Sequence, residues 1–417
     1  MNFNLKIKTF LCVFIFVLKI KQNFSLPHES PVPFHNFTSL SVAVADLEIF
    51  INRINGTLNF PSLLFAFSVR GQVVLKKAWG TADLENNLPA HVNMLYRIGS
   101  ITKTFTSTLI GRLVDQKLLH FEDLVSKYLP EKTFPAKRID GQLTNMTISQ
   151  LLSHTSGLKE TDTMHDFFTT VDPPANITEH IRRFKDEPLA HAPGTFTYSN
   201  NGFQVLGAII EAVTKKPFQQ VMTEFLRSNH FPAAVNKESS MVLHEVPRYY
   251  LGQNIRQKLD PVKIRSKEIY PTAPYDDLLY LNGWWATGGI VASLDDMLHY
   301  GQLLLRSHHG KEGAILSKET LTKLWYPRVE TPQGASFLKY RYGYGWRSAP
   351  TGANPGLRYG NTGGIVAHSG GLLGSTAFLM IYPKEEIVAI MLSNKGQLHE
   401  QEKMVVYALE NMVHLVK

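Results

Sequence analysis

Apolar residues recur with the spacing of an α-helix at several points along the chain. Every fourth position from Ile101 to Leu113 is apolar, which gives a helix one continuous face to bury. A glycine at the end of the stretch from Leu151 to Leu158 predicts the end of another helix. The same spacing predicts further helices over residues 39–54, 202–213, about 218–226, 294 to about 305, and 401–415.

Short runs of aliphatic, aromatic and β-branched residues predict strands, and turn residues join some of them into hairpins. Arg70-Gly71 separates two such runs near the N-terminus, and Pro383-Lys384 separates two near the C-terminus. The strands that we expect cover residues 63–69, 73–77, 342–346, 365–371, 376–382 and 387–392.

The predicted elements run in the order helix, hairpin, long helical middle, antiparallel sheet and terminal helix. This order predicts an α+β fold in which both ends of the chain build one antiparallel sheet flanked by helices. A helical subdomain, about residues 115–290, would be an insertion beside the sheet and leave a cleft between the two. Residues 233–275 are charged and interrupted by prolines, so we expect an excursion or lid there.

The first 25 residues have the pattern of a targeting segment. Lys6 and Lys8 precede an apolar run over residues 10–18, which is short for a membrane span and suits the core of a signal peptide. No small-residue cleavage site follows, so both a signal peptide and an uncleaved signal anchor are open, with a mitochondrial presequence as the alternative. We expect residues 26–39 to be a flexible lead-in and residues 40–417 to form the folded domain.

Cysteine, sequon and charge content bear on the compartment and the partners. Cys12 is the only cysteine and lies in the targeting segment, so the folded domain has no disulfide and no thiolate metal site. Lysines before residue 29 supply four of the eight net positive charges, and no basic run with interleaved aromatics predicts nucleic-acid binding. Asn-x-Ser/Thr sequons favour a glycoprotein that is secreted or stays in the ER lumen, with the mitochondrion as the alternative. They begin at Asn23, Asn36, Asn55, Asn145 and Asn176.

Ser100 and Lys103 form a Ser-x-x-Lys motif where the helix ending near Leu113 begins. Residues three apart share a helix face, so the amine can reach the hydroxyl. A serine hydroxyl needs a positioned base to become a nucleophile, and a lysine can serve if burial or a neighbouring cation lowers its pKa. A helix N-terminus also offers backbone N–H groups to a developing oxyanion. The same motif recurs at Ser156/Lys159 and Ser336/Lys339.

Two further patterns stand at element boundaries, where side chains can face the same cleft. Tyr198-Ser199-Asn200 precedes a predicted helix, and His368-Ser369-Gly370-Gly371 closes a predicted strand. His154 and Ser156 lie in the helix end over residues 151–158, and we interpret them as ordinary helix-end and turn residues. The Tyr-x-Asn pattern also occurs at Tyr280 and Tyr359, and the His-x-Gly pattern also occurs at His299 and His308.

Serine–lysine acyl-transfer enzymes carry Ser-x-x-Lys, then a hydroxyl-and-amide motif, then a basic residue with glycine on a strand, in this order. From about residue 40 to its end, the chain therefore resembles the serine β-lactamase and penicillin-binding-protein superfamily, in its class C-like branch. Within that branch it is most similar to the animal serine β-lactamase-like (LACTB-like) proteins. The residues that carry the resemblance are Gly99–Lys103, Leu151–Leu158, Pro193-Gly194, Tyr198–Asn200, Ala286–Gly289, Tyr342–Trp346 and His368–Gly371.

The resemblance implies a serine hydrolase that cleaves an ester, amide or peptide bond through an acyl-enzyme. Ser100 would be the nucleophile, and Lys103 and Tyr198 would share proton transfer, Tyr198 as phenolate or through its hydroxyl. Asn200 would orient Lys103 or a substrate amide. The backbone N–H groups of Ser100 and Gly371 would form the oxyanion hole.

The strand motif departs from the pattern that the superfamily often shows. In place of Lys-Thr-Gly the chain has His368-Ser369-Gly370. Because histidine is neutral over much of the physiological range, it binds a substrate carboxylate less reliably than lysine does. This favours esterase or peptidase chemistry over strong penicillin turnover, and it leaves open that His368 is a packed strand residue.

Other enzyme classes lack their motifs in this sequence. No Gly-x-Ser-x-Gly elbow, no His-Glu-x-x-His and no phosphate-binding loop occurs. We therefore expect no cofactor and no metal. The expected partner is a small-molecule or peptide substrate, with self-assembly open and membrane contact only through an uncleaved anchor. The competing hypothesis is a non-catalytic protein that uses this fold for binding or assembly.

Overall fold

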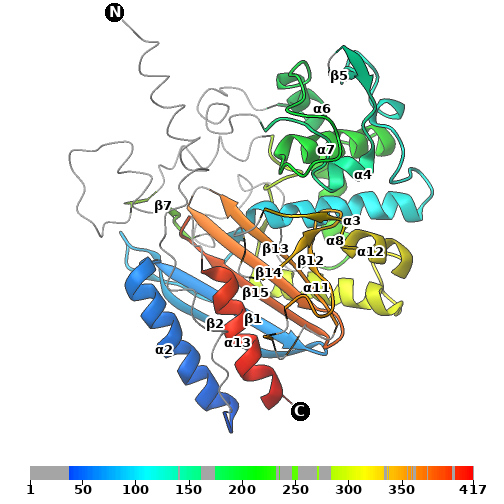
Figure 1. The fold of residues 1–417 in the computed structure, drawn as a ribbon. Helices are drawn as coiled ribbons and strands as arrows, with labels where there is room; N and C mark the ends of the chain where they lie inside the picture. The colour runs from blue at the N-terminus through cyan, green and yellow to red at the C-terminus, as the bar shows by residue number, and fades with distance from the viewer. Residues whose placement is uncertain are drawn as a thin grey trace, which may run out of the picture.

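Figure 1 shows the chain as a computed structural model. No described helix is both long and apolar enough to cross a membrane. Our predictions for residues 1–25, most of the lead-in and most of residues 233–275 lie outside the described residues, and the domain boundary near residue 40 stays a prediction. The structure describes residues 37–139, 141–160, 174–231, 234, 247–251, 270–271, 283–332, 336, 338–354, 356–357, 359, 363–372, 374–396 and 400–416.

Both ends of the described chain build one antiparallel sheet, as the order of elements predicts. The hairpin of β1 (Ser62–Val69) and β2 (Gln72–Asp83) pairs through β1 with β15 (Ile387–Ser393). Beyond β15 follow β14 (Ser375–Tyr382) and β13 (Ile365–Leu372). The described part of this sheet has the order β10-β11-β12-β13-β14-β15-β1-β2-β3. Its short strands are β3 (Leu88–Pro89), β10 (Val329–Glu330), β11 (Arg341–Tyr342) and β12 (Arg347–Ala349).

Helices cover both faces of the sheet, so the central strands are buried on both sides (Figure 1). Alternate residues of β1 enter two separate cores: Leu64 packs on one side and Phe65 on the other. Helices α2 (Leu40–Leu58) and α13 (Gln401–Met412) cover the Phe65 side. Helices α3 (Thr102–Asp115), α11 (Leu294–His309) and α12 (Lys318–Trp325) cover the Leu64 side. These layers confirm the α+β prediction.

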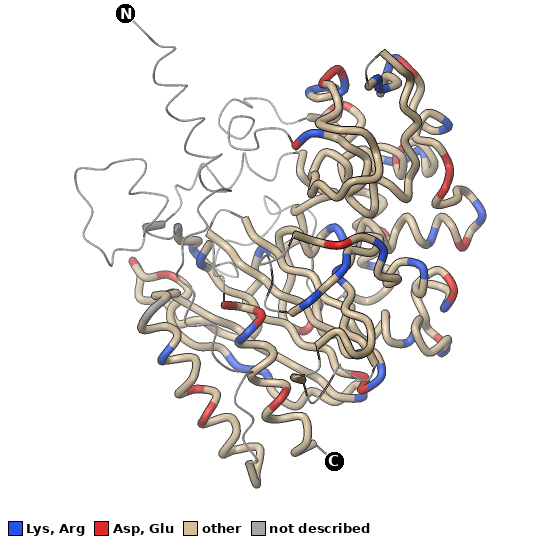
Figure 2. The backbone as a smooth tube through the Cα atoms, in the orientation of Figure 1, with Lys and Arg blue, Asp and Glu red and all other residues tan. Residues whose placement is uncertain are grey.

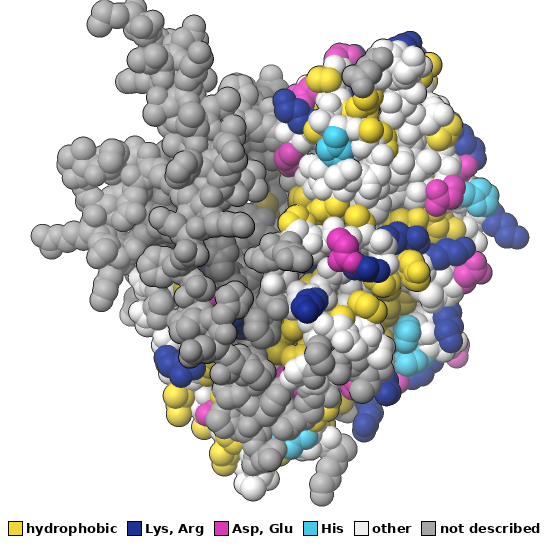
Figure 3. All heavy atoms as spheres, in the orientation of Figure 1, with side chains coloured by type: hydrophobic (Ala, Val, Ile, Leu, Met, Phe, Trp, Pro, Cys, Tyr) yellow, Lys and Arg dark blue, Asp and Glu magenta, His cyan; other side chains and the backbone are white. Residues whose placement is uncertain are grey.

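The helical part packs beside α3, at the end of the sheet that carries the candidate site (Figure 1). Its central helix is α7 (Asn200–Thr214), which contacts α3 and the shorter helix α4 (Ile148–Leu152). Figure 3 shows hydrophobic side chains grouped where the helical part meets the sheet part. The remaining described elements include α6 (Ile177–His180), α8 (Phe218–Ser228), β4 (Tyr96–Arg97), β5 (Lys137–Ile139), β6 (Gln142–Thr144), β7 (Tyr250–Leu251), β8 (Tyr270–Pro271) and β9 (Val291–Ala292).

The strand predicted from Tyr342 to Trp346 is wrong over most of its length. β11 ends at Tyr342, and a turn follows in which the N–H of residue 343 donates to the Trp346 carbonyl at 2.7 Å. Gly345 needs its glycine, because its φ is +77° and a Cβ would lie 1.9 Å from Ser107 Oγ. Tyr344 and Trp346 are buried in the core. Aromatic residues are also typical of strands, so the composition of this turn resembles that of a strand.

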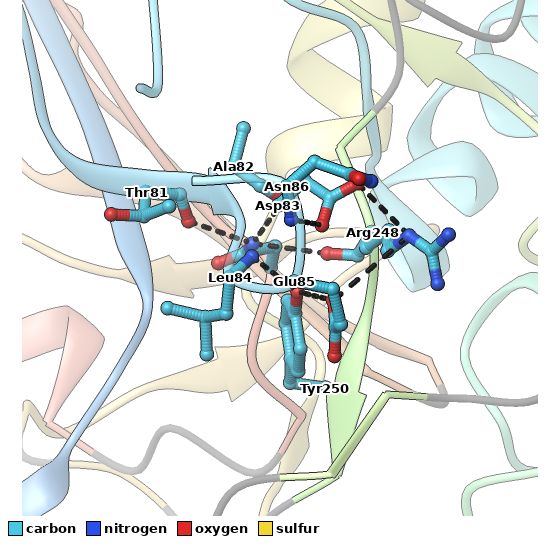
Figure 4. A network of polar contacts seen from close by, with 9 residues as sticks. Thr81, Ala82, Asp83, Leu84, Glu85, Asn86, Arg248 and Tyr250 are labelled. Atoms are coloured by element: carbon cyan, nitrogen blue, oxygen red, sulfur yellow. Dashed lines mark hydrogen bonds and ion pairs between the residues drawn. The ribbon is translucent and has the colours of Figure 1, made fainter. Parts of the chain in front are cut away.

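A polar network holds the segment over residues 247–251 against the end of β2 (Figure 4). Arg248 Nε lies 2.9 Å from Asp83 Oδ2, and Tyr250 donates its hydroxyl to Glu85 Oε2 at 2.7 Å. Between them, Tyr249 accepts the backbone N–H of Arg97 at 3.0 Å. The segment therefore braces β4, the strand that runs directly into the Ser-x-x-Lys motif.

Candidate active site

The structure places Ser100 in a 3₁₀ turn, η1 (Gly99–Ile101), that runs directly into α3. Lys103 lies one turn further, and its Nζ is 3.0 Å from Ser100 Oγ and 3.0 Å from the Thr287 carbonyl. Lys103 has no exposed surface, whereas Ser100 is half-buried. A buried amine thus stands directly behind a reachable hydroxyl, the arrangement that a serine nucleophile and its base require.

Burial governs the charge of Lys103. Removal from water lowers the pKa of this amine to about 7, and the Glu160 carboxylate opposes that shift. Two aromatic rings face the amine, with Nζ 5.0 Å from the centre of Tyr198 and 5.8 Å from that of Phe203. A large fraction of Lys103 is therefore neutral near pH 7 and can accept a proton.

Tyr198 lies on the other side of the Ser100 hydroxyl, at the entry to α7. Burial raises its pKa, and a hydrogen bond with the Ser100 side chain only partly opposes this. Tyr198 is therefore a neutral phenol at physiological pH, which favours the hydroxyl over the phenolate role. The next residue, Ser199, caps α7 by accepting the Gly202 N–H at 3.3 Å, so the helix start fixes where Tyr198 stands.

The glycine pair of β13 packs directly against the turn that carries the nucleophile. A Cβ on Gly370 would lie 1.9 Å from the Ile98 carbonyl oxygen and 3.3 Å from the Ser100 nitrogen. A Cβ on Gly99, whose φ is +52°, would lie 2.8 Å from the Gly371 nitrogen. β12 pairs with β13 only over residues 365–367, so this edge of β13 is open to the turn. The two backbones that would supply the oxyanion hole are thus brought together.

Asn200 contacts a carboxylate and has no hydrogen bond to Lys103. Its side-chain amide and its backbone N–H both donate to Glu160, each at 2.5 Å. Burial raises the pKa of Glu160, and the two bonds from Asn200 oppose that rise. Asn200 therefore acts on Lys103 only through Glu160, the carboxylate that raises the pKa of the amine.

His368 is 1% exposed, and both of its ring nitrogens have partners within the protein. Nε2 lies 2.8 Å from the Tyr342 hydroxyl and Nδ1 lies 2.6 Å from the Ser369 carbonyl. This geometry favours the packed-strand interpretation of His368 over contact with a substrate.

Sequence reasoning did not find Glu160, Thr287 or Tyr342 as members of this site. Glu160 stands in a polar stretch without a pattern. Thr287 and Tyr342 belong to motifs that carry the family resemblance, but those motifs do not predict the contacts that the two residues make here. His154 was a visible candidate that we interpreted as structural, yet its ring centre is 4.2 Å from that of Tyr198.

Other described features give no competing site. No group of three or more His, Cys, Asp or Glu side chains in the described ranges is arranged to hold a metal ion. A cleft of about 710 Å³ lies in the helical part, between Tyr128 and Pro217, and contains none of the predicted site residues. Of its two acidic residues, Glu179 and Glu211, the second already accepts N–H groups from α6 and α8. In Figure 2 basic and acidic positions are interspersed over the described surface.

The Beta-lactamase family matches the chain over residues 50–410, which include every predicted site residue. The chain belongs to this family. Human serine beta-lactamase-like protein LACTB, mitochondrial, is 23% identical over 411 residues, covering 80% of this chain and 71% of that protein.

Solved structures of the superfamily share the fold. The octameric penicillin-binding protein homologue from Pyrococcus abyssi superposes with a TM-score of 0.71 at 24% identity, covering 88% of this chain and 76% of that one. A class C beta-lactamase superposes with a TM-score of 0.67 at 20% identity, covering 92% and 99%. These likenesses confirm the class C-like, LACTB-like resemblance of the sequence.

Proposed function

We propose that this member of the Beta-lactamase family is a serine hydrolase that cleaves an ester, amide or peptide bond through an acyl-enzyme on Ser100. One observation carries the proposal: the fully buried amine of Lys103 lies 3.0 Å from Ser100 Oγ. With a pKa of about 7, that amine is a base matched to neutral pH. A protein that used the fold only for binding would gain nothing from burying this lysine behind a serine.

The contacts support a definite order of proton transfers. Neutral Lys103 takes the Ser100 proton as Oγ attacks the substrate carbonyl, and the N–H groups of Ser100 and Gly371 stabilise the oxyanion. Tyr198 donates its hydroxyl proton to the leaving group and is reprotonated by the Lys103 ammonium. Water then attacks the acyl-enzyme, with the same groups accepting and returning its proton, and releases the acid.

The strand motif bears on the substrate class. His368 is buried, and its neutral ring has both nitrogens occupied, so β13 offers no side-chain cation to a substrate carboxylate at this position. This supports an esterase or peptidase rather than an efficient penicillin hydrolase.

An active-serine phosphonate probe tests the proposal against the non-catalytic hypothesis. The wild-type chain should be labelled at Ser100, and Ser100→Ala should lose both labelling and ester turnover while its thermal melt is unchanged. Ser336→Ala, in another Ser-x-x-Lys match of the same chain, is the matched control and should label like wild type. Wild-type protein that resists the probe and all ester and peptide substrates would support the non-catalytic hypothesis.

We propose a mitochondrial address ahead of secretion, because the LACTB relatives are named as mitochondrial proteins. Import of the full chain into isolated mitochondria, with protection from added protease, is the expected result. Glycosidase-sensitive mobility would instead establish ER entry, through sequons such as Asn55. The octameric homologue supports self-assembly as a further property, which light scattering would measure.

A further inference from the structure

Two buried histidines and one tyrosine form a continuous hydrogen-bonded chain behind the candidate site. The Ser199 N–H lies 3.1 Å from His154 Nδ1, and His154 Nε2 lies 3.2 Å from the Tyr342 hydroxyl. That hydroxyl lies 2.8 Å from His368 Nε2, and His368 Nδ1 lies 2.6 Å from the Ser369 carbonyl. Both histidines are 1% exposed, so neither end of the chain is completed by solvent.

The two ends fix the direction of every proton in this chain. A backbone N–H can only donate, so His154 Nδ1 is an acceptor and its proton is on Nε2. A backbone carbonyl can only accept, so His368 carries a proton on Nδ1. Because burial lowers the pKa of His368 well below 6.5, the ring is neutral and its Nε2 accepts. The Tyr342 hydroxyl then accepts from His154 and donates to His368. All four bonds are satisfied when both rings are neutral and in opposite tautomers.

The hydrogen-bonded chain links the start of α7 to β13. Its first donor is the residue after Tyr198, and the His154 ring packs against the Tyr198 ring with centres 4.2 Å apart. Its last acceptor is Ser369, which directly precedes the glycine pair of β13. One series of hydrogen-bonded side chains therefore joins the start of α7, which holds the proposed proton donor Tyr198, to β13, which carries the proposed oxyanion-hole N–H of Gly371.

We propose that His154, Tyr342 and His368 are positioning residues that set the distance between Tyr198 and β13. The proposal rests on the proposed hydrolase function, since it assigns these residues to that reaction. None of them needs to touch substrate. The Tyr342 hydroxyl is the sensitive point, because its removal leaves two facing histidine nitrogens without a bridge while the ring remains in place.

Tyr342→Phe is the direct test, and Tyr344→Phe is its matched control in the same turn. Tyr344 is also largely buried, but its hydroxyl contacts Glu122, at 3.4 Å, and Ser149, neither of which belongs to the hydrogen-bonded chain. Misplacement of catalytic groups by about 1 Å can cost ~10²-fold, so Tyr342→Phe should lower kcat by about 10- to 100-fold with KM within about twofold. Tyr344→Phe should leave both constants unchanged. Equal kcat in Tyr342→Phe and wild type would overturn the positioning role.

Two substitutions of His154 test the contributions of its two ring nitrogens separately. Asn presents an oxygen near the position of Nδ1 and keeps an acceptor for the Ser199 N–H, whereas Gln reaches only toward Tyr342. Each variant therefore keeps one bond and breaks the chain at the other, so both should lower kcat. His154 has a φ of +57°, which asparagine tolerates better, so both variants are compared at a temperature where each is fully folded. Wild-type kcat in either fully folded variant would contradict the proposal.

A spectroscopic measurement tests the chain without any substrate. In protein labelled with ¹⁵N-histidine, His154 should show the Nε2–H tautomer and His368 the Nδ1–H tautomer, both neutral at pH 7. The opposite tautomers, or a charged ring, would overturn the inference even in an active enzyme. The expected tautomers in a protein that no serine probe labels would instead refute the proposed hydrolase function and leave the hydrogen-bonded chain as a structural feature.

Discussion

Lys103 is fully buried, which is an unfavourable environment for an amine. Its unperturbed pKa is 10.5, and burial brings this to about 7. Burying an amine costs free energy whether it stays charged or gives up its proton. The Thr287 carbonyl and the Ser100 hydroxyl return part of this as hydrogen bonds, and the Glu160 carboxylate acts on the amine electrostatically. The protein therefore loses some stability and gains one amine that can accept a proton at neutral pH.

The pH dependence of kcat/KM should report Lys103 directly. Because the neutral amine is the active form, kcat/KM for one ester should rise with pH through about 7. Glu160→Gln removes a negative charge that raises the pKa of Lys103. The acid limb of the profile, which is the rise of kcat/KM with pH, should therefore move to lower pH. Glu319→Gln, an exposed carboxylate on α12, is the control and should leave the limb in place. An acid limb that Glu160→Gln leaves unmoved or moves upward would contradict this electrostatic assignment.

At this scale the sequence predicts residues that belong to short motifs and misses those that do not. Ser100 and Lys103 are three positions apart, so one helical turn brings them together and a local pattern reveals them. Glu160 and Tyr342 reach the site through long-range packing. Tyr342 belongs to a motif of the family resemblance, but no local spacing predicts which distant residues Glu160 or Tyr342 contacts. For this reason the roles of the site residues stay predictions, while their proximity is a structural observation.

Between elements, the decisive contact is that of η1 with the open edge of β13. Side chains are excluded there, because the Gly370 and Gly99 backbones approach neighbouring main-chain atoms directly. Main-chain atoms cannot swing aside as a flexible side chain can, so the contact fixes the two elements against each other.

Neighbouring glycines of β13 should respond to alanine in opposite ways. Gly370→Ala puts a methyl group 1.9 Å from the Ile98 oxygen, so it should cost about 1–3 kcal/mol in free energy of unfolding and most of kcat. A Cβ on Gly371 meets nothing within 4 Å, and alanine keeps its backbone N–H. Gly371→Ala should therefore keep a near wild-type melting temperature and activity. Calorimetry and ester turnover measure both, and equal effects at the two positions would contradict this account of the contact.

The sequence predicts long elements well and short ones poorly. The helices α2, α3 and α7 and the strands β13, β14 and β15 all occur where apolar periodicity or strand-like runs place them. Helix α12 was not predicted, because its eight residues offer too few apolar positions for a periodic signal. The aromatic turn after β11 was mistaken for a strand, because burial of its side chains and strand formation favour the same residue types.

For the whole molecule, several buried histidines link folding to pH. Burial lowers the pKa of His154 and His368 well below 6.5, and that of His180 to about 3. The unfolded chain therefore binds more protons than the folded chain below about pH 6.5, and stability falls as the pH falls. Glu160, whose pKa burial raises, acts in the opposite direction.

Urea unfolding at pH 7 and pH 5 should show this loss. A single histidine shifted from 6.5 to about 3 accounts for about 2 kcal/mol between these two pH values. His180→Gln removes that histidine from the end of α6, so the loss of stability of the variant from pH 7 to pH 5 should be smaller than that of wild type by about this amount. Identical pH dependence in variant and wild type would exclude His180 as a contributor.

The pairing of β1 with β15 has a consequence during protein synthesis. The Ser62 N–H donates to Asn394 Oδ1 across 332 positions of sequence. At a translation rate of roughly 5–20 residues per second, the β1–β2 hairpin waits about 15 to 70 seconds on the ribosome before β15 is made. During that time β1 presents an unpaired hydrophobic edge, the kind of surface at which nascent chains aggregate. The candidate active site is thus assembled late, only once β13 and β15 have been made and β15 has paired with the waiting hairpin.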